Sequence, residues 1–310
     1  MASQDATVPQ SLDGSRLDKA VTELFHAASR ARTKRAIDEG KVLVNGRRAA
    51  KGALVKAGDV LTLQADDGLT GDPPAVAEPD APLAVRHESA GVVVVAKPAG
   101  QPTAPIRAGE TGTLANALVG RYPELAGVGH SPREPGLVHR LDTDTSGLVI
   151  AARTPEAFAA LDAALKREAI EKLYYVVCAE DGLPDEGSID YPIANHPKDR
   201  RRVYPCVHPR DVVRYQPRPA STRFSVVRRE GGLALAEVHV TKALRHQIRA
   251  HFAALGFPLV GDALYGGPAR EGLQRHALHA FRVRYPGPPA DLAFDVTEPL
   301  PPDLEALFGA

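Results

Sequence analysis

The sequence predicts an α+β protein made of two folded units, and three observations support this prediction. The chain has 310 residues, which is more than one domain of ordinary size. Residues 11–65 carry eleven Lys and Arg against six Asp and Glu, whereas residues 66–82 carry five acids and no base. From residue 83 onward, apolar segments of helical and strand spacing alternate irregularly, which favours a mixed sheet with helices packed on it.

The change of charge and composition predicts the domain boundaries. Residues 1–10 are expected to form a loose tail, and residues 11–65 a compact unit with a net charge of +5. Residues 66–82 combine their five acids with two Gly and four Pro, a composition too polar to form a core, so we interpret them as a linker. Residues 83–310 form the second, larger unit.

The first unit is predicted to contain two short helices followed by short strands. Apolar residues at helical spacing predict a helix over residues 17–25, and Ser29 can cap a second helix that extends to Ile37. A strand is expected over residues 42–44, because the following Asn45-Gly46 pair is typical of a hairpin turn. Residues 60–63 supply a closing strand. This pattern is that of a small α+β module.

The second unit is predicted to alternate strands and helices without a regular order. Thr154-Pro155 is a typical helix start, with a capping hydroxyl followed by a proline in the first turn. The other expected elements are strands over residues 92–96, 147–151, 172–179 and 233–240, and helices over residues 113–119 and 245–255.

The composition excludes several classes of protein. Lys plus Arg and Asp plus Glu both number 38, so a uniformly basic nucleic-acid coat is excluded and any polyanion must be bound by local patches. With two cysteines and no ligand cluster, neither a disulfide framework nor a metal site is expected. We also expect no leader peptide, no membrane span and a cytoplasmic location.

The densest group of polar residues extends from His139 to Gly147, directly before an apolar strand. A carboxylate beside an arginine, as in Arg140-Leu141-Asp142, can serve as a nucleophile or a general base. The alternative is a polar loop in which the aspartate caps its own backbone. The residue pattern alone leaves both interpretations open.

This segment resembles the HRLDxxTSG signature of the RluA-type family of RNA pseudouridine synthases. Four further elements resemble those of the family and occur in its order. They are Lys97-Pro98-Ala99-Gly100, Glu171-Lys172-Leu173-Tyr174, His246-Gln247-Ile248-Arg249, and Gly261-Asp262 with Tyr265-Gly266. The resemblance covers roughly residues 83–285 and implies a catalytic domain with a mixed, mainly antiparallel sheet flanked by helices.

Residues 11–65 separately resemble the RNA-binding domain first known from a small-subunit ribosomal protein, the S-four type. The similarity includes Arg16-Leu17-Asp18, the Gly40–Gly46 segment and Gly58-Asp59. Together with the positive charge, this similarity predicts that the unit binds RNA. The expected RNA-binding residues of the whole chain are Arg30, Arg32, Lys34, Arg35 and Lys41 in this unit, and Lys97 and Arg140 in the larger one.

The family resemblance implies that uridine in RNA is isomerised to pseudouridine by a catalytic aspartate, with no metal or other cofactor. It assigns this role to Asp142, which can add to the sugar or abstract a sugar proton. Tyr174 would stack on the extruded base and help remove its ring proton; without the motif, it is an ordinary tyrosine of a half-buried strand. Arg140 would face the RNA backbone or help displace the base, and its alternative is a local ion pair with Asp142 or Asp144.

Arg249 borders an apolar helical stripe that includes Ile248 and Phe252, so its charge needs a partner or a path to solvent. The family arrangement implies that Asp142 is this partner, and the alternative is an arginine whose head group reaches water. The family usually has TGRT before HQIR, whereas this chain has Lys242-Ala243-Leu244-Arg245.

A Pro-rich stretch of the larger unit is also strongly basic, and two interpretations of it stay open. It can contribute to RNA binding, or it can be a solvated loop. Its basic residues are Lys198, Arg200, Arg201, Arg202, Arg210, Arg214, Arg218 and Arg223.

The expected substrate is large-subunit ribosomal RNA, bound by a monomer without a small-molecule cofactor. One alternative is a pseudouridine synthase acting on transfer RNA. Another is a non-catalytic RNA-binding ribosome-assembly protein, although the intact Asp142, Tyr174 and Arg249 argue against it. A glycoside hydrolase built on Asp142 and Asp144 is disfavoured, because the chain has no Trp to stack on a sugar.

Overall fold

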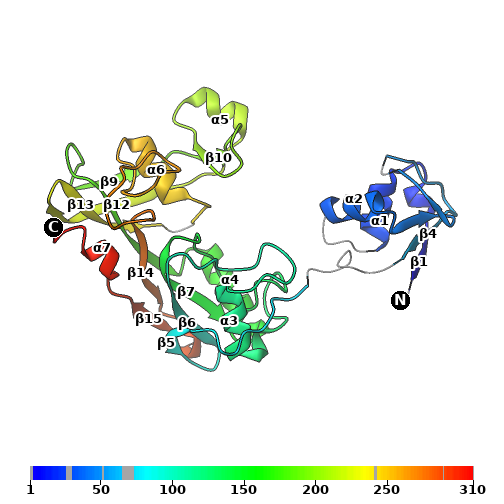
Figure 1. Cartoon of the computed structure of the whole chain (residues 1–310), viewed down its shortest axis with the longest axis horizontal. Helices are drawn as coiled ribbons and strands as arrows, with labels where there is room; N and C mark the ends of the chain where they lie inside the picture. Colours follow the sequence, from blue (N-terminus) through cyan, green and yellow to red (C-terminus); the bar gives the residue numbers. More distant parts are fainter. Residues whose placement is uncertain are drawn as a thin grey trace. The chain divides into compact units, whose positions relative to one another are not determined.

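The chain divides into two compact units, Met1–Pro74 and Ala75–Ala310, each with its own hydrophobic core (Figure 1). The structure is a computed structural model. It describes residues 3–25, 30–50, 52–64, 73–240, 243–288 and 290–309, and for residues 30–32 it describes the backbone alone.

The first unit packs two helices against a four-stranded sheet of order β1-β4-β2-β3. Its elements are β1 (Gln4–Thr7), η1 (Gln10–Leu12), α1 (Leu17–Leu24), α2 (Arg30–Asp38), β2 (Val42–Val44), β3 (Arg47–Arg48) and β4 (Val60–Leu63). The helices and strands predicted from the sequence are all present. The expectation of a loose tail over residues 1–10 is wrong for Gln4–Thr7, which pair with Val60–Leu63 as an edge strand.

The β2–β3 hairpin forms where Asn45-Gly46 predicted it. Both residues adopt positive φ, 50° for Asn45 and 76° for Gly46, as a two-residue hairpin turn of this kind requires. The Asn45 side chain closes the turn onto β4, because its Nδ2 donates to Asp59 and its Oδ1 accepts from the Val60 amide. The predicted cap at Ser29 lies outside the described residues.

The second unit is built on a nine-stranded sheet of order β5-β6-β7-β14-β8-β13-β12-β9, with β15 paired to β14. The β7–β14 pair is parallel and the other pairs of this sheet are antiparallel, so the predicted mixed, mainly antiparallel sheet is confirmed. Its strands are β5 (Ala84–Glu88), β6 (Val92–Lys97), β7 (Ser146–Ala152), β8 (Glu171–Ala179), β9 (Glu186–Ile189), β12 (Thr222–Glu230), β13 (Leu233–His239), β14 (Leu278–Tyr285) and β15 (Phe294–Thr297).

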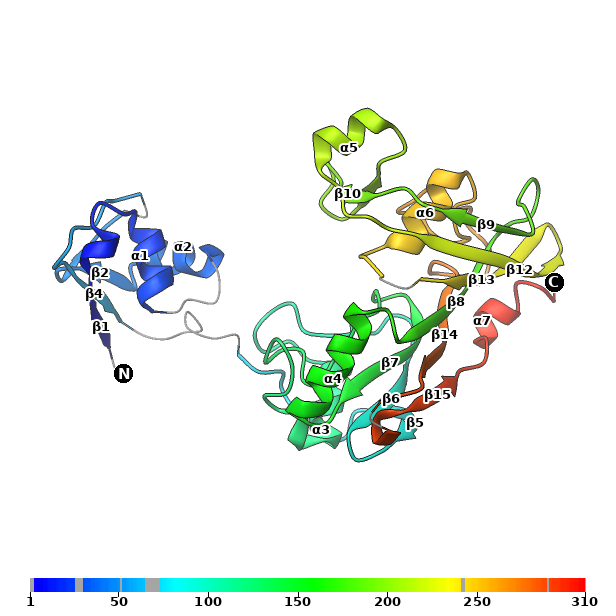
Figure 2. The ribbon, with the colours of Figure 1, turned by 180° about the vertical axis from the view of Figure 1, so that it is seen from behind.

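Helices cover both faces of this sheet. On one face, α3 (Leu114–Arg121) packs over the β5–β7 half and α6 (Gln247–Leu255) over the β12–β13 half (Figures 1 and 2). On the other face, α4 (Pro155–Lys166) covers β6 and β7. The remaining elements are η2 (Pro123–Leu125), the β10–β11 hairpin (Ile193–Asn195 and Val203–Pro205), α5 (Pro209–Tyr215), η3 (Ala290–Leu292) and α7 (Pro302–Glu305).

The parallel pairing of β7 and β14 depends on a close backbone approach at Gly147. A Cβ at this position would lie 2.2 Å from the carbonyl oxygen of Ala280, and the φ of Gly147 is 117°. Only glycine satisfies both constraints without strain. The glycine at the end of the polar segment therefore joins the strand that follows Asp142 to the centre of the sheet.

The predicted linker is not uniform. Ala75 belongs to the core of the larger unit, and its amide donates to the Pro132 carbonyl. The Glu78 amide donates to the carbonyl of Asn116, whose fully buried side chain donates in turn to Val76. The expectation that the segment up to residue 82 lies outside the core is therefore wrong from Ala75 onward. Residues 65–72 lie outside the described residues.

These contacts predict different stabilities for two truncated proteins. A chain of residues 73–310 retains the hydrogen bonds of this segment. A chain of residues 83–310 loses the Val76 acceptor of the Asn116 side chain, which keeps Glu110 and Thr113 as partners, and the amide donors to the Asn116 and Pro132 carbonyls. The loss of several hydrogen bonds should lower the free energy of unfolding of the shorter chain by about 3 kcal/mol. This corresponds to a fall in its Tm of roughly 5–10 °C. Thermal unfolding followed by circular dichroism measures the difference, and equal Tm values would contradict the packing role of this segment.

Candidate active site

The loop that carries Asp142 is fixed by hydrogen bonds on both sides of this residue. The Thr103 hydroxyl donates to the Leu141 carbonyl at 2.7 Å and accepts from the Leu141 amide at 3.2 Å. On the other side, the Lys97 amine donates to the Thr143 carbonyl at 2.8 Å. The backbone around Asp142 is therefore held rigidly at the N-terminal end of β7.

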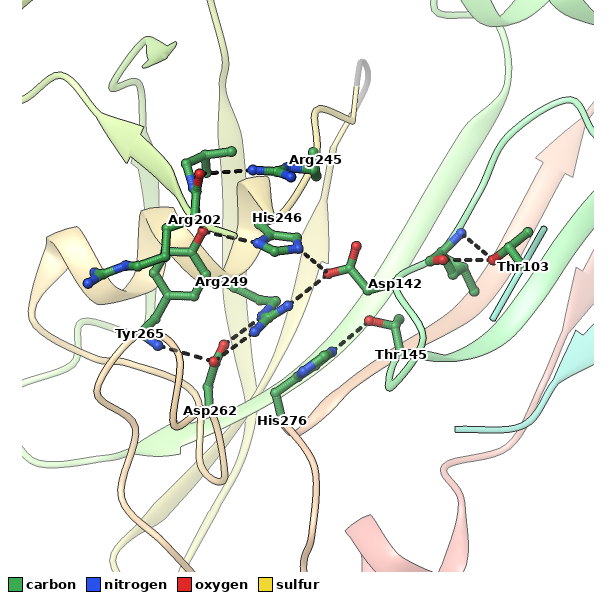
Figure 3. Close-up of polar contacts among 12 residues, drawn as sticks. Thr103, Asp142, Thr145, Arg202, Arg245, His246, Arg249, Asp262, Tyr265 and His276 are labelled. Atoms are coloured by element: carbon green, nitrogen blue, oxygen red, sulfur yellow. Dashed lines mark hydrogen bonds and ion pairs between the residues drawn. The ribbon is translucent and has the colours of Figure 1, made fainter. Parts of the chain in front are cut away.

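A second connection ties this loop to β14. Nε2 of His276 lies 2.8 Å from the Thr145 hydroxyl (Figure 3). Burial lowers the pKa of His276 to about 4, so its imidazole is neutral at physiological pH. The contact joins the residues just before the two parallel strands, and it orients the loop without adding a positive charge beside Asp142.

Arg249 lies between two aspartates at the start of α6 (Figure 3). Its Nη1 donates to Oδ2 of Asp142 at 3.0 Å, while Nε and Nη2 donate to Oδ2 and Oδ1 of Asp262 at 2.7 and 2.8 Å. The side chains of Arg249 and Asp262 are 8% and 1% exposed, whereas that of Asp142 is 25% exposed. The buried pair with Asp262 thus aims one edge of the guanidinium at the accessible aspartate.

Asp142 keeps one oxygen available for chemistry. The Arg249 contact and the nearby His246 Nε2, at 3.7 Å, both involve Oδ2. Among the described residues, Oδ1 has no hydrogen-bond partner. A carboxylate with one oxygen held and the other accessible is suited to react with a bound molecule.

His246 is held by Tyr265. Its Nδ1 lies 3.1 Å from the Tyr265 hydroxyl, which also accepts from the amide of Val203 at 2.9 Å. Burial lowers the pKa of His246, although the nearby Asp142 opposes this shift. The predicted helix over residues 245–255 begins two residues later than expected, because His246 adopts a positive φ of 53° and precedes the first helical residue.

Tyr174 lines the same pocket as Asp142, together with Leu141, Leu278 and Ile248. It lies on β8, at the centre of the sheet, and its ring is buried. Burial, and then the charge of Asp142, raise the pKa of the Tyr174 hydroxyl. The hydroxyl therefore remains protonated at neutral pH. To act as a proton acceptor, Tyr174 would first have to lose this proton, which is unfavourable, whereas stacking of its ring on a base needs no change of protonation.

Lys97 does not occupy the position expected of an RNA-binding residue. It is 1% exposed, and its amine donates to the carbonyls of Pro98, Gln101 and Thr143. Burial lowers the pKa of Lys97 to about 8. A buried amine with three carbonyl acceptors has no free donor for a phosphate, so the prediction that Lys97 contacts RNA is wrong; it stabilises the loop around Asp142 instead.

Of the other predicted RNA-binding residues, Arg140, Lys34 and Arg35 are exposed, Lys41 is half-buried, and the side chains of two lie outside the described part of the chain. Arg140 is exposed and lines the pocket, but its ion pair is with Glu134 at 2.7 Å, not with Asp142 or Asp144. Lys34 and Arg35 are exposed on α2; Arg35 and Lys41 both contact Glu39. The side chains of Arg30 and Arg32 lie outside the described residues.

Asp262, Tyr265 and His246 were not assigned roles from the sequence. The signal was present, since Asp262 and Tyr265 belong to the motif that follows HQIR. A pattern in one dimension could not show that the acid of this motif binds the same arginine as Asp142. Asp262 and Arg249 meet because the loop after α6 folds back against this helix.

The described ranges hold neither a metal-binding cluster nor a membrane-spanning helix. No group of three or more His, Cys, Asp or Glu there is arranged to hold a metal ion. In the same part of the chain, none of the helices has both the length and the apolar character needed to cross a membrane.

The geometry agrees with the comparisons with known proteins. The profile of the family described as RNA pseudouridylate synthase matches residues 91–254, and that of the S4 domain matches residues 15–61. The chain belongs to the RNA pseudouridylate synthase family. It is therefore an RNA pseudouridine synthase with an N-terminal S4 domain, and both predictions are confirmed.

Relatives match over nearly the whole chain. It is 34% identical, over 99% of its length, to a Xanthomonas campestris pv. campestris protein named ribosomal large subunit pseudouridine synthase D, and it covers 92% of that protein. It is 38% identical, over 97% of its length, to an uncharacterized RNA pseudouridine synthase of Chloroflexus aurantiacus, of which it covers 91%.

A solved structure shares the fold. The human RNA Pseudouridylate Synthase Domain Containing 1 superposes with a TM-score of 0.57 at 24% identity, covering 73% of this chain and 87% of that one.

The contact between Arg249 and Asp262 predicts the behaviour of Asp262→Asn. The near-isosteric amide keeps an acceptor for the Tyr265 amide but loses the charge, so the guanidinium is free to turn and occupy both oxygens of Asp142. We expect kcat to fall at least about tenfold while the Kd for RNA stays within about twofold of wild type.

The matched control is Asp295→Asn, which disrupts a two-pronged pair with Arg282 at the surface. Single-turnover kinetics and binding assays measure the rate and the Kd for RNA of both variants, and only Asp262→Asn should have a lower rate. Equal rates for the two variants would show that Asp262 does not position Arg249.

Proposed function

We propose that this enzyme isomerises uridines of large-subunit ribosomal RNA, with Asp142 as the catalytic carboxylate. The observation that carries the proposal is the Asp142 side chain, fixed by Arg249 through one oxygen and open through the other, in a pocket lined by Tyr174. The ribosomal substrate is supported by near full-length similarity to proteins named ribosomal large subunit pseudouridine synthase D.

The reaction requires a group that can act on an electron-poor sugar carbon. The bond between N1 of uracil and C1′ of ribose breaks, the base turns, and a bond forms between C5 and C1′. The proton on C5 is lost and N1 gains one, so atoms and electrons balance without a redox partner. Asp142 Oδ1 acts at the ribose as the base departs, in the way that carboxylates serve at glycosidic centres.

The target base must leave its stack before it can reach Asp142. Tyr174 supplies a buried aromatic face beside the carboxylate on which the extruded uracil can stack. Arg140, exposed at the mouth of the same pocket, is placed to contact the RNA backbone once its pair with Glu134 opens. The S4 domain adds affinity through phosphate contacts, with Lys34 and Arg35 on the exposed side of α2.

The first test compares Asp142→Asn with Asp144→Asn. The two aspartates share one loop, but Asp144 is exposed and makes no side-chain ion pair within the described residues. We expect Asp142→Asn to lower the rate of isomerisation more than about a hundredfold, which is an increase of roughly 2.7 kcal/mol in the activation free energy. The rate of Asp144→Asn should remain near that of wild type. Tritium release from RNA labelled at C5 of uracil measures both.

The substrate is tested by mapping pseudouridines in total RNA from a deletion strain and its parent. Loss of sites in large-subunit ribosomal RNA supports the proposal. Loss confined to transfer RNA, or an active Asp142→Asn enzyme, would contradict it.

Replacing Tyr174 by Phe separates the ring from the hydroxyl. Phe keeps the stacking surface, so the Kd for RNA should change by less than about threefold, while Leu should weaken binding further. If the hydroxyl assists removal of the C5 proton, Tyr174→Phe lowers the single-turnover rate by about a hundredfold or more. A wild-type rate for Tyr174→Phe would restrict Tyr174 to stacking.

A further inference from the structure

Three arginines gather beside the active site without a carboxylate partner. They are Arg200 and Arg202, in and beside the β10–β11 hairpin, and Arg245, just before α6. Nη2 of Arg245 donates to the backbone carbonyl of Arg202 at 2.9 Å (Figure 3) and to that of Arg200 at 3.0 Å. Within the described residues, none of these three guanidinium groups pairs with an Asp or a Glu. We call these three residues the arginine cluster.

Arg202 has a donor that the protein leaves unused. Its guanidinium lies over the Tyr265 ring, 5.2 Å from the centroid. Its Nε is buried and has no hydrogen-bond partner in the described part of the chain. A buried donor without an acceptor destabilises the protein, and a ligand that accepts from it removes this penalty. Because the donor belongs to a cation, an anion is the ligand that it favours.

The arginine cluster is connected to the reactive carboxylate by a short series of contacts. The amide of Val203, next to Arg202, donates to the hydroxyl of Tyr265, which contacts His246. His246 in turn lies 3.7 Å from Asp142. The arginine cluster and the Asp142 pocket are therefore linked through Val203, Tyr265 and His246.

The surrounding segment reinforces this preference. Residues 198–218 carry seven Lys and Arg against two Asp, a net charge of +5. Both acids are already engaged, Asp199 by Arg201 and Asp211 by the Tyr204 hydroxyl. A merely solvated loop would not bury an unpaired guanidinium nitrogen. Both views show α5 and the β10–β11 hairpin on the same side of the sheet as α6 (Figures 1 and 2), and β11 contacts α6.

We propose that the arginine cluster binds a phosphodiester group of the RNA, close to the nucleotide whose base enters the Asp142 pocket. Planar guanidinium groups offer paired donors that match two phosphate oxygens. Arg245 occupies the stretch in which this chain departs from the TGRT pattern, and its contacts with two carbonyls fix the β10–β11 hairpin against α6. This inference rests on the proposed function only in requiring RNA as the substrate.

The test measures RNA binding by the full chain, independently of activity. The probe is a twelve-residue oligouridylate, with Kd measured by fluorescence anisotropy across a series of salt concentrations. Arg202→Gln should weaken binding about tenfold and reduce the slope of log Kd against log salt by about 0.7, the value for one lost contact with a single strand. Arg202→Lys, which keeps the charge but loses the planar donors, should fall between.

Arg201→Gln is the matched control, because it removes the same charge from the neighbouring residue. Arg201 is 80% exposed and already neutralised by Asp199, so its loss should change Kd by less than about twofold. Equal losses for Arg201→Gln and Arg202→Gln would reduce the effect to general electrostatics and overturn the proposal. Unchanged binding by a folded Arg202→Gln variant, checked by its Tm, would do the same.

A second measurement locates the phosphate. In a stem-loop of ribosomal RNA, each phosphate near the central uridine is replaced in turn by a neutral methylphosphonate. One replacement should weaken binding to wild type but not to Arg202→Gln, and equal penalties for the two proteins at every position would contradict the proposal. Failure of the enzyme to modify this stem-loop would count against the ribosomal substrate, while the oligouridylate result still decides the phosphate site.

Discussion

The architecture of the site depends on one guanidinium shared by two carboxylates. Asp262 is almost fully buried and binds Arg249 through two of its nitrogens, so the arginine is held before any substrate arrives. The remaining nitrogen then contacts Asp142. Asp142, Arg249 and Asp262 thus form one connected group of two carboxylates and one guanidinium. The arginine thereby holds one oxygen of the accessible carboxylate, whose other oxygen has no hydrogen-bond partner among the described residues.

This arrangement also explains why Arg249 cannot be treated as an isolated side chain. Replacing it by an apolar residue would leave the buried Asp262 without a charged partner, a change that typically lowers the free energy of unfolding by about 3–5 kcal/mol. The same arginine therefore contributes to stability and to the geometry of Asp142. The loop after α6 supplies both Asp262 and Tyr265. Asp262 binds the Arg249 guanidinium, and the Tyr265 hydroxyl contacts His246.

The sheet brings the components of the site together from distant parts of the chain. Asp142 precedes β7, Tyr174 lies on β8, and Arg249 is on the helix that follows β13. Between β7 and β8 lies β14, which pairs with both and contributes Leu278 to the pocket. Gly147 permits the parallel contact that joins β7 to β14, so a single glycine beside the polar loop determines where Asp142 sits relative to Tyr174.

Much of this could be predicted from the sequence, because it depends on residues close together along the chain. The hairpin at Asn45-Gly46, the capped start of α4 at Thr154 and the buried strand β6 follow from local turn, capping and hydrophobic patterns. The pairing of Arg249 with Asp142 was implied by the family resemblance, and the structure confirms the contact. The strand at Gln4–Thr7 was missed, because a short polar edge strand is stabilised by its partner and not by its own residues.

The sequence by itself determined the two-unit organisation, the α+β class, the family and the three residues around which the site is built. Only the tertiary structure decided what each neighbouring charge does. Lys97 and Arg202 are both basic residues near family motifs, yet one is buried among three carbonyls and the other keeps a donor without a partner. The role of a charge depends on its burial and its partners, and these are fixed by segments that meet only after the chain has folded.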